Sequence, residues 1–489
     1  MRVAPWSPTP ERTTWGEYRA DLTLTRVLTA ALDDRAARVM LTGAPPPRDF
    51  FLEPLPPGWE VARLFLDLDT PAAKYRHPHS DHAVEIRRAA EWFGDGTYTR
   101  TDAREAWDAT ARILAGSGRS GAAMFRSPGA TGFDLWLRTT GGDVPDPLDD
   151  ELQQLIRSTT PQHRIELVPP TGRDELPGLW VYDGRLMYAA LLRELGAGPA
   201  QRLLADDAER LAADPYSRAR YRVRFAAPEW WGDTGLPNVI LTPAGPSPRD
   251  GWHTPREGEA WVDAAELHLA RRYDWTATVL EAIAYTKGRP LDAWGARLLR
   301  ARDRATDDAL GATVGPLVRS AIRACLLHAV GSFHSTGRAE MTITASPMQR
   351  PFGDGWDAPT TADDGRAIWR RQWSPSAPTA RMMAGRHPEW SAGVYGRSHA
   401  RILESPTSHP VRKAGALRVP RGQLVSIYGD AVMTSARQPW ADLDDGQVGR
   451  LRLKGHLCGP IPYPTTARER DQASRAATAA GTTCEKGCP

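Results

Sequence analysis

The most informative stretch of the chain is Leu179-Trp-Val-Tyr-Asp183-Gly-Arg-Leu-Met-Tyr188-Ala-Ala-Leu-Leu-Arg-Glu-Leu195. Its first half is apolar and rich in strand-forming residues, and it ends in the carboxylate of Asp183. Its second half carries apolar residues at helical spacing among good helix formers. The pattern predicts a strand that delivers Asp183 to its C-terminal end and turns directly into a helix. Such a rigid support suits a metal-binding carboxylate, although an Asp that only caps the helix fits the same pattern.

Two later stretches also place polar residues at the ends of apolar segments. The first, Arg323-Ala-Cys-Leu-Leu-His-Ala-Val-Gly331, closes a long basic helical region. The second, Leu424-Val-Ser-Ile-Tyr428-Gly429-Asp430-Ala431-Val432-Met-Thr434, has two β-prone segments on either side of a Gly-Asp pair. Because Gly permits a tight turn, this stretch predicts a hairpin that presents Asp430 at its tip.

Taken in order, the three stretches resemble motifs A, B and C of family B DNA polymerases, the group that includes the protein-primed phage enzymes. Motif A of the family reads DxxSLYP, and Asp183 and Tyr188 have the matching separation. Motif B reads KxxxNSxYG, of which the stretch ending at Gly331 keeps a basic residue and the final Gly. Motif C reads YxDTDS, and Tyr428-Gly-Asp430 keeps its first half. The resemblance covers about residues 175–460.

The resemblance implies an α+β fold in which a polymerase-like palm, an antiparallel sheet with helices, carries helical-hairpin fingers and follows an N-terminal α/β region. It implies a DNA-directed DNA polymerase that uses two-metal nucleotidyl transfer, with Mg²⁺ or Mn²⁺ held by Asp183 and Asp430. The family's second motif C Asp is Val432 here, so motif C is degenerate and the metal site would be short of a ligand.

Further residues take roles from the same resemblance. Tyr188, Arg319 and Arg323 would bind the nucleotide. Tyr428 and Lys454 would contact nucleic acid, since Lys454-Gly-His456 stands where the family has a basic-x-Tyr signature. The expected partners are DNA, dNTP and a terminal or accessory replication protein, in the setting of a mobile element. The opposing interpretation, favoured by Val432, is a catalytically inactive DNA-binding replication accessory factor or transcriptional regulator.

The basic region before Gly331 predicts two helices with arginine rows. Leu291–Ala305 places Arg297, Arg300 and Arg304 on one face, and Val314–Val330 presents Arg319 and Arg323 opposite them. Two helices with arginines across a gap would grip a triphosphate or nucleic acid. A surface hairpin held by salt bridges is the alternative, although few acidic residues lie nearby.

The N-terminal region predicts a second nucleic-acid-binding element. Helices at Asp81–Phe93 and Asp102–Leu114, followed by a hairpin of residues 122–126 and 133–138, resemble a winged helix. A generic α+β packing module fits the pattern equally well. An apolar strand ending at Asp67 and Asp69 resembles the remnant of a proofreading exonuclease.

The sequence His77-Pro-His79-Ser-Asp81-His82 resembles the metal loop of metallo-β-lactamase-like hydrolases. In those enzymes the loop follows an apolar strand and precedes a Gly-rich turn. Here a predicted helix follows, so Asp81 is better explained as a helix cap and the histidines as a solvated loop.

Length and composition limit the number of domains, the partners and the location that we expect. The 489 residues suffice for several domains, and we divide them into an N-terminal region (1–150), a polymerase-like palm and fingers (151–465) and a polar, disordered tail (466–489). A net charge of +3 is too small to identify a polyanionic partner. Only 4 cysteines, without a signal peptide or an apolar run of membrane-spanning length, predict a soluble protein of the reducing cytoplasm.

Overall fold

The chain folds into two compact units, each built from two stretches that are distant in sequence. The computed structural model describes residues 12–65, 71–80, 82–116, 124, 127–141, 143–169, 174–244, 252–335, 339–344, 346–348, 350–351, 355–361, 367–372, 386–407, 413–440 and 447–482. The first unit comprises Met1–Val144 and Ala293–Arg386, and the second comprises Pro145–Asp292 and His387–Pro489. Residues 293–386, which the sequence interpretation placed in the palm and fingers, therefore pack with the N-terminal region.

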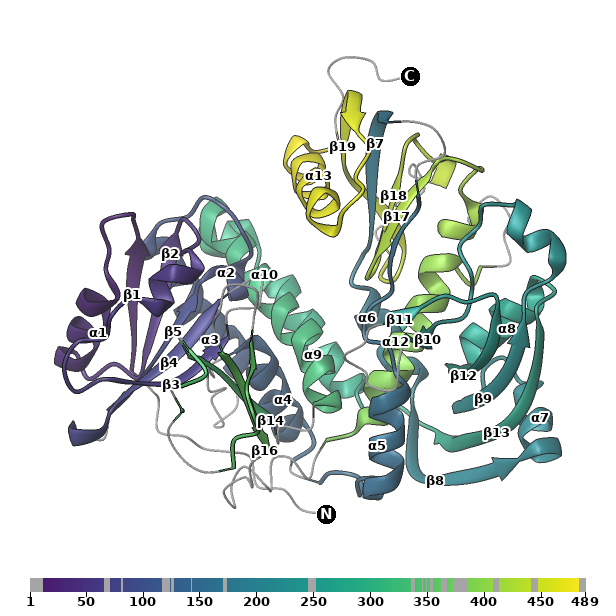
Figure 1. Cartoon of the computed structure of the whole chain (residues 1–489), viewed down its shortest axis with the longest axis horizontal. Coiled ribbons are helices and arrows are strands. Elements are labelled where there is room, and N and C mark those ends of the chain that lie inside the picture. Colours follow the sequence, from purple (N-terminus) through teal and green to yellow (C-terminus); the bar gives the residue numbers. More distant parts are fainter. Residues whose placement is uncertain are drawn as a thin grey trace. The chain divides into compact units, whose positions relative to one another are not determined.

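The first unit contains a five-stranded mixed sheet of order β1-β2-β5-β4-β3 (Figure 1). The neighbours β1, β2 and β5 pair in parallel, and β5, β4 and β3 pair antiparallel. One face packs on α1 (Leu24–Asp33) through a core that includes Leu28, Val39, Tyr75 and Ile86. The strand bounds are Thr13–Tyr18 (β1), Arg38–Gly43 (β2), Glu60–Phe65 (β3), Ala72–His77 (β4) and His82–Arg88 (β5).

A helical layer completes this unit. Its long helix α10 packs against α4, α3 and α2. The contact with α4 is so close that a Cβ at Gly132 would overlap the carbonyl oxygen of Cys325. The bounds are Ala90–Phe93 (α2), Arg100–Ala115 (α3), Pro128–Thr139 (α4), Asp292–Arg304 (α9) and Asp307–His334 (α10), with a small sheet of Ala339–Thr344 (β14), Thr360–Thr361 (β15) and Ala367–Gln372 (β16).

Within the described residues, α10 alone has the length and composition of a membrane-spanning helix, which the sequence analysis had not recognised. Its packing in the core of the first unit accounts for its apolar character equally well.

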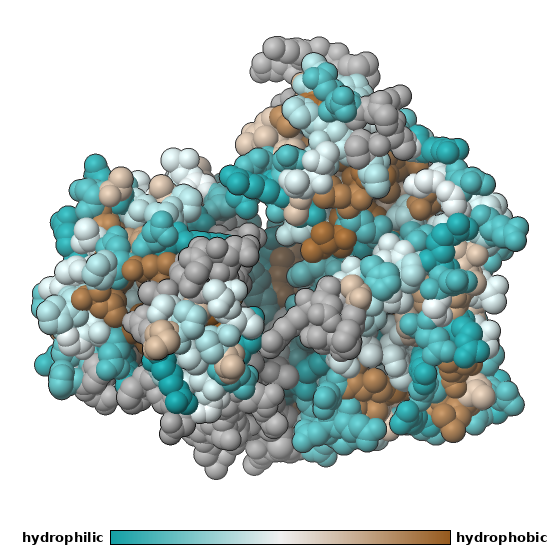
Figure 2. Space-filling model, in the orientation of Figure 1, coloured by the Kyte–Doolittle hydropathy of each residue, from teal (hydrophilic) through white to brown (hydrophobic). Residues whose placement is uncertain are grey.

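On the face shown in Figure 2 the surface is largely hydrophilic, with smaller apolar areas interspersed.

The predicted winged helix is wrong. Residues 133–138 belong to α4 and not to a strand, because Ser127 caps the helix through the Ala130 N–H and Pro128 occupies its first turn. The predicted helix at Asp81–Phe93 is also wrong, since β5 fills most of it and lies between β2 and β4. Helix α3 confirms the predicted helix at Asp102–Leu114.

The histidine-rich segment forms the tight connection between β4 and β5. His77 and His82 are paired across the two strands. The Ser80 hydroxyl lies 2.9 Å from His77 Nδ1, and His82 Nε2 lies 3.1 Å from the Ala36 carbonyl oxygen. The described residues contain no group of three or more His, Cys, Asp or Glu that could hold a metal ion. Asp67, Asp69 and Asp81 lie outside the described residues.

The second unit holds an antiparallel five-stranded sheet of order β19-β7-β18-β17-β6 and a four-stranded sheet of order β12-β9-β13-β8. The first is built from Ile165–Leu167 (β6), Glu175–Gly184 (β7), Leu424–Tyr428 (β17), Ala431–Thr434 (β18) and Leu451–Pro462 (β19). The second is built from Gly196–Leu204 (β8), Ala219–Ala226 (β9), Glu257–Asp263 (β12) and Thr276–Lys287 (β13). A two-stranded pair, Thr242–Pro243 (β10) and Trp252–His253 (β11), is separate.

The helices of this unit are Asp150–Thr159 (α5), Met187–Leu191 (α6), Ala205–Ala212 (α7), Ala264–Arg272 (α8), Pro388–Leu403 (α12) and Ala467–Ala480 (α13). The prediction of a helix directly after the Asp183 strand is confirmed by α6, which continues as a short 3₁₀ turn, Leu192–Glu194. The mixture of helices and several sheets confirms the α+β class.

The two faces of the five-stranded sheet have different cover. One face, with Tyr182, Ile427 and Val432, lies in the large core that also contains α8, α12 and the four-stranded sheet. The other face, with Leu179, Val181 and Met433, packs on α13 (Figure 1). Among the described cysteines, Cys325 is a buried free thiol, whereas Cys458 in β19 is disulfide-bonded, which the argument from composition did not predict.

Helix α13 corrects the predicted disordered tail over residues 467–480. Thr466 and Glu469 form a reciprocal capping box at its start. Ala473 and Ala477 then bury one stripe of the helix on the sheet. Cys484 and Cys488, in the remainder of the predicted tail, lie outside the described residues.

Candidate functional site

The predicted strand edge and hairpin tip meet in one antiparallel sheet. Asp183 in β7 is paired with Ala431 in β18 on one side and with Arg452 in β19 on the other. Ala431 is in turn paired with Tyr428 in β17. Directly paired residues point to the same face of a sheet, so these four side chains form one row across four strands. We call Tyr428, Ala431, Asp183 and Arg452 the Asp183 row.

Two tight turns place this row at the end of the sheet. The hairpin between β17 and β18 turns at Gly429 and Asp430, and Gly429 has a φ of 61°, which glycine adopts without strain. Between β7 and α6, Leu186 has a φ of 47°, a left-handed conformation that is costly for a residue with a side chain. Strain of this kind persists only where the surrounding structure enforces it. The turn after Asp183 is therefore held in a defined shape.

Asp183 lies close to Lys454 and is directly paired with Arg452 in the neighbouring strand β19. Its exposed fraction is 5%, and Lys454 Nζ lies 4.0 Å from its Oδ2. Lys454 is an extra residue in the pairing of β19 with β7, where the register shifts between Leu453 and Gly455. Arg452 has a buried Nε with no hydrogen-bond partner among the described residues. The carboxylate of Asp183 and the cationic side chains of Lys454 and Arg452 thus lie at the same end of this sheet face.

The opposite end of the row is aromatic. Tyr428 is 37% exposed, and the guanidinium of Arg470 from α13 lies 4.1 Å from the centre of its ring. Arg470 is 2% exposed and pairs with Asp471 at 2.6 Å. The ring is therefore supported by a fixed cation, and its exposed part offers a surface on which a flat group can stack.

The side chain of Asp430 is directed to the face of the sheet opposite to that of Asp183. The backbone carbonyl oxygen of Asp430 accepts a hydrogen bond from Gly184 N at 2.9 Å, and a Cβ at Gly184 would lie 3.5 Å from that of Asp430. Since Gly184 follows Asp183 in the strand, the pleat directs the Asp430 side chain away from the Asp183 face. A cation held jointly by the two carboxylates stays a prediction that requires Asp430 to reach around the edge.

Two tyrosines accompany Asp430. The rings of Tyr188 and Tyr395, from α6 and α12, meet edge to face with their centres 5.8 Å apart. Burial raises the pKa of Tyr188, and the proximity of Tyr395 and Asp430 adds to this effect. Burial likewise raises the pKa of Tyr395. Both phenols therefore remain neutral, and they form a mostly apolar wall beside the hairpin tip.

The residues of the row fit one magnesium ion better than two. Val432, where the resemblance would place a second carboxylate, is 0% exposed and points into the large core. The residue that faces Asp183 across the strands is Ala431. The described residues supply no cluster of three ligating side chains. Mg²⁺ is commonly held by one or two carboxylates together with substrate phosphates, so Asp183 can hold one ion that arrives with its substrate.

The predicted arginines belong to the first unit and differ in their contacts. Arg297 donates to Leu114 O at 2.8 Å and to the Thr139 hydroxyl at 3.3 Å. Arg319 donates to Ala305 O at 2.6 Å and pairs with Asp307 at 2.8 Å. Arg300, Arg304 and Arg323 are exposed and make no hydrogen bond or ion pair with a described residue. Helix α10 packs mainly along α4, α3 and α2, and it meets the predicted partner helix α9 through the rings of Phe333 and Trp294, whose centres lie 6.2 Å apart.

Three residues near the site were missed by the sequence analysis. Arg452 could have been found from its alternation with Lys454 in a basic strand. Tyr395 precedes Gly396, and this pair repeats the Tyr-Gly ending of the motif B pattern. Arg470 gave no signal, because it lies in a polar segment that resembles a tail.

Comparisons with known proteins identify the fold alone. No protein-family model matches the chain, and no curated protein matches it. Among solved structures, an orthorhombic crystal form of phi29 DNA polymerase matches with a TM-score of 0.51 and 9% identity, covering 89% of this chain and 78% of that one. The ternary complex of phi29 DNA polymerase with primer-template DNA and incoming nucleotide substrates matches with a TM-score of 0.51 and 8% identity, covering 90% and 80%. The chain therefore has a fold similar to that of phi29 DNA polymerase.

Proposed function

We propose that this protein binds primer–template DNA and dNTP at the end of the five-stranded sheet that carries Asp183 and the β17–β18 hairpin tip, and that it catalyses template-directed nucleotidyl transfer. The observation that carries the proposal is the Asp183 row, in which an aromatic ring, a carboxylate and a cation are aligned across one sheet. The fold supports it, because the similar phi29 enzyme has been solved with primer-template DNA and nucleotide. The order of the motif-like stretches along the chain points the same way.

Each member of the row has a chemical task in this proposal. Tyr428 offers its supported ring to the terminal base or sugar of the primer. Arg452 and Lys454 bind phosphate oxygens through their cationic groups. Asp183 holds a divalent cation, which would supply positive charge to the reacting phosphate. Positioning of the 3′-hydroxyl and the α-phosphate by these side chains provides the remaining part of the rate enhancement.

Within the first unit, we propose that the exposed arginines of α9 and α10 contact the DNA backbone. Arg300, Arg304 and Arg323 are exposed and have no ion-pair partner among the described residues. Arg297 and Arg319 make structural hydrogen bonds, so their predicted roles in binding nucleic acid and nucleotide would require those bonds to break. Phosphate contacts of this kind add affinity without sequence preference.

The experiment that tests this function is primer extension by the purified full-length protein on a primer–template of defined sequence. We expect incorporation that follows the template in the presence of Mg²⁺ or Mn²⁺. DNA binding, measured as a function of salt, should weaken steeply as salt rises. Specific DNA binding without any incorporation, under either metal, would overturn the catalytic part of the proposal.

A second candidate is a DNA-binding accessory protein with an inactive site. It is favoured by Ala431, which leaves Asp183 without a facing carboxylate. This candidate predicts salt-sensitive DNA binding that is unchanged when Asp183 is replaced by Asn.

A further inference from the structure

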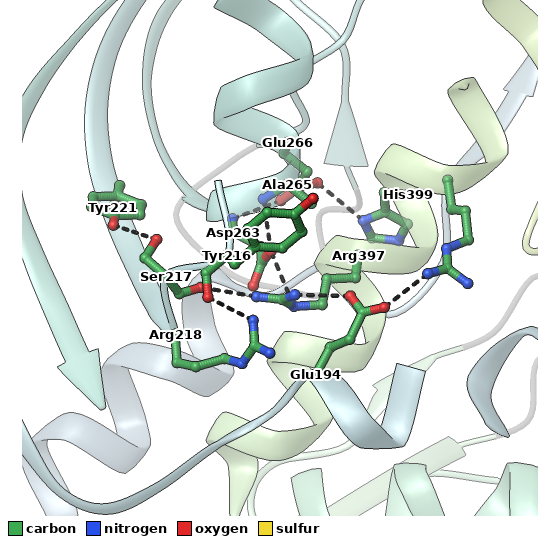
Figure 3. Close-up of polar contacts among 11 residues, drawn as sticks. Glu194, Tyr216, Ser217, Arg218, Tyr221, Asp263, Ala265, Glu266, Arg397 and His399 are labelled. Atoms are coloured by element: carbon green, nitrogen blue, oxygen red, sulfur yellow. Dashed lines mark hydrogen bonds and ion pairs between the residues drawn. The ribbon is translucent and has the colours of Figure 1, made fainter. Parts of the chain in front are cut away.

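Glu194, Arg397 and their polar neighbours form an ionic cluster (Figure 3). Glu194, at the end of the segment after α6, accepts hydrogen bonds from Arg397 at 2.9 Å and from Arg401 at 2.9 Å. The two arginines are one turn apart on α12 and so present their guanidinium groups side by side. The side chain of Arg397 is 4% exposed. A buried arginine of this kind is sensitive to the loss of its carboxylate partner.

The cluster joins the two segments that carry the tyrosines. Glu194 follows Tyr188 in the same short helical segment, and Arg397 follows Tyr395 by two positions on α12. The ion pair and the ring contact therefore both join the segment after β7 to α12, from different sides of that helix. A change in the Glu194–Arg397 contact would shift this segment relative to α12 and so alter the separation of the rings.

The α12 side of this contact is fixed independently. Arg397 also donates to Ser217 O at 3.0 Å and lies 3.5 Å from Asp263. Asp263 caps α8 through Ala265 N at 2.9 Å. A Cβ at Gly396 would lie 2.5 Å from the Asp263 Cβ, so α12 and the start of α8 are in the closest possible contact. Helix α12 is thus held in place independently of Glu194. Loss of the Glu194 contact should therefore shift the segment that carries Glu194 and not the helix.

The other arginine extends the cluster toward β19. A Cβ at Gly449 would lie 2.6 Å from Arg401 Nη1. Gly449 N donates to Arg185 O at 2.6 Å, and Arg185 N donates to Arg450 O at 2.8 Å. Arg401 therefore supports the turn that connects the segment after Asp183 with the start of the Arg452 strand.

We infer that Glu194 is a positioning residue that fixes the spacing of Tyr188 and Tyr395 and thereby sets the affinity for the incoming nucleotide. The inference rests on the proposed function, and it adds that the tyrosine wall beside the hairpin tip contacts the nucleotide. Glu194 touches no reacting group, and it acts through the two segments that it joins. Misplacement of such a wall by about 1 Å is enough to cost a large factor in the use of a substrate.

The chain offers a matched control at the opposite end of α12. Glu404 is a fully buried carboxylate, whereas Glu194 is partly exposed, and it accepts hydrogen bonds from Arg272 Nη1 at 2.7 Å and Tyr273 Oη at 2.7 Å. It caps the C-terminal end of the helix, and Tyr188 and Tyr395 are not among its hydrogen-bond partners. Glu404→Ala should therefore lower thermal stability at least as much as Glu194→Ala does, without changing nucleotide affinity.

The experiment measures dNTP affinity of the protein–DNA complex by equilibrium titration, with Ca²⁺ in place of Mg²⁺ so that no turnover is needed. Glu194→Ala should raise the Kd of the dNTP about tenfold while the Kd of DNA stays within twofold. Glu194→Gln, which keeps one acceptor, should recover part of the loss. In extension assays the same variants should raise KM more than they lower kcat.

Three results would overturn the inference. An unchanged dNTP affinity in Glu194→Ala, with the wild type binding normally, refutes the positioning role alone. An equal loss of affinity in Glu404→Ala shows general softening of α12. Absence of dNTP binding by the wild type removes the proposed function as well, which separates that failure from the first.

Discussion

Ala431 and Val432 are neighbours in β18, yet they belong to different parts of the molecule. Val432 is buried in the large core with Tyr182 and Ile427. Ala431 is half-buried and faces Asp183 across the strands. The comparison teaches that a one-residue difference along a strand decides whether a side chain supports the fold or lines the site. The motif pattern locates the strand but does not by itself reveal which positions face the site.

The largest expected effect comes from placing the same carboxylate at each of the two positions. Val432→Asp should destabilise the protein by about 4 kcal/mol or more, because it buries an unpaired charge in an apolar core. Ala431→Asp should cost about 1 kcal/mol or less, since the only new penalty is a like charge opposite Asp183. Urea unfolding of both variants measures the difference. Equal losses would mean that the two faces are assigned incorrectly.

On the site face, Arg452 should contribute to DNA binding and little to stability. Arg452→Met should weaken primer–template affinity about tenfold. It should also reduce the slope of log affinity against log salt concentration by about one. Arg224→Met is the control, because Arg224 is an exposed strand arginine paired with Glu259 at 2.8 Å on the other sheet. A fluorescence titration over a range of salt concentrations compares them. The comparison fails if the control loses as much affinity as Arg452→Met.

The new carboxylate of Ala431→Asp should also create a response to metal. Two carboxylates on paired positions repel each other by about 0.2–1 kcal/mol, and a divalent cation relieves this repulsion. We expect Mg²⁺ to raise the Tm of Ala431→Asp by several degrees relative to the wild type. Differential scanning calorimetry with and without Mg²⁺ tests this independently of activity. A Tm insensitive to Mg²⁺ would indicate that residues 183 and 431 do not face each other.

The smallest effect is expected at the aromatic end of the row. Arg470→Met keeps the apolar contact with Tyr428 but removes the cation, which is worth about 0.5–1 kcal/mol at a site of this kind. DNA affinity should fall about twofold to fivefold, and Tyr428→Ala should cause a larger loss. If Arg470→Met binds DNA more weakly than Tyr428→Ala, Arg470 acts by itself and not through the ring.

Sequence reasoning predicted the central sheet but not which distant segments of the chain pack around it. The apolar run before Asp183 and the two segments around the Gly-Asp pair predicted strands that do share one sheet, with β18 paired to β7 on one side and to β17 on the other, because both the periodicity and the Gly-Asp turn are local features. The same reasoning placed a strand over residues 133–138, where the cap at Ser127 and its Pro determined a helix instead. It assigned a disordered tail where a capping box and two buried alanines form α13.

The site residues divide in the same way. Asp183 and Lys454 were predicted from motif-like patterns, and they lie within 4.0 Å of each other. Whether Arg297 and Arg319 are free or engaged depends on contacts with segments far away in sequence, which periodicity does not reveal. Glu194 and Arg470 could not be predicted for the same reason, since their partners lie on α12 and β17.

The most direct test of the account is the effect of Asp183→Asn on primer extension and DNA affinity in the same preparation. Asn keeps the shape of the side chain and removes its charge, so the fold should be retained. The account predicts that extension falls at least about 100-fold while the Kd for primer–template DNA changes less than about threefold. Extension at the wild-type rate, or the absence of extension by the wild type itself, would contradict the claim that Asp183 is the catalytic carboxylate of a polymerase.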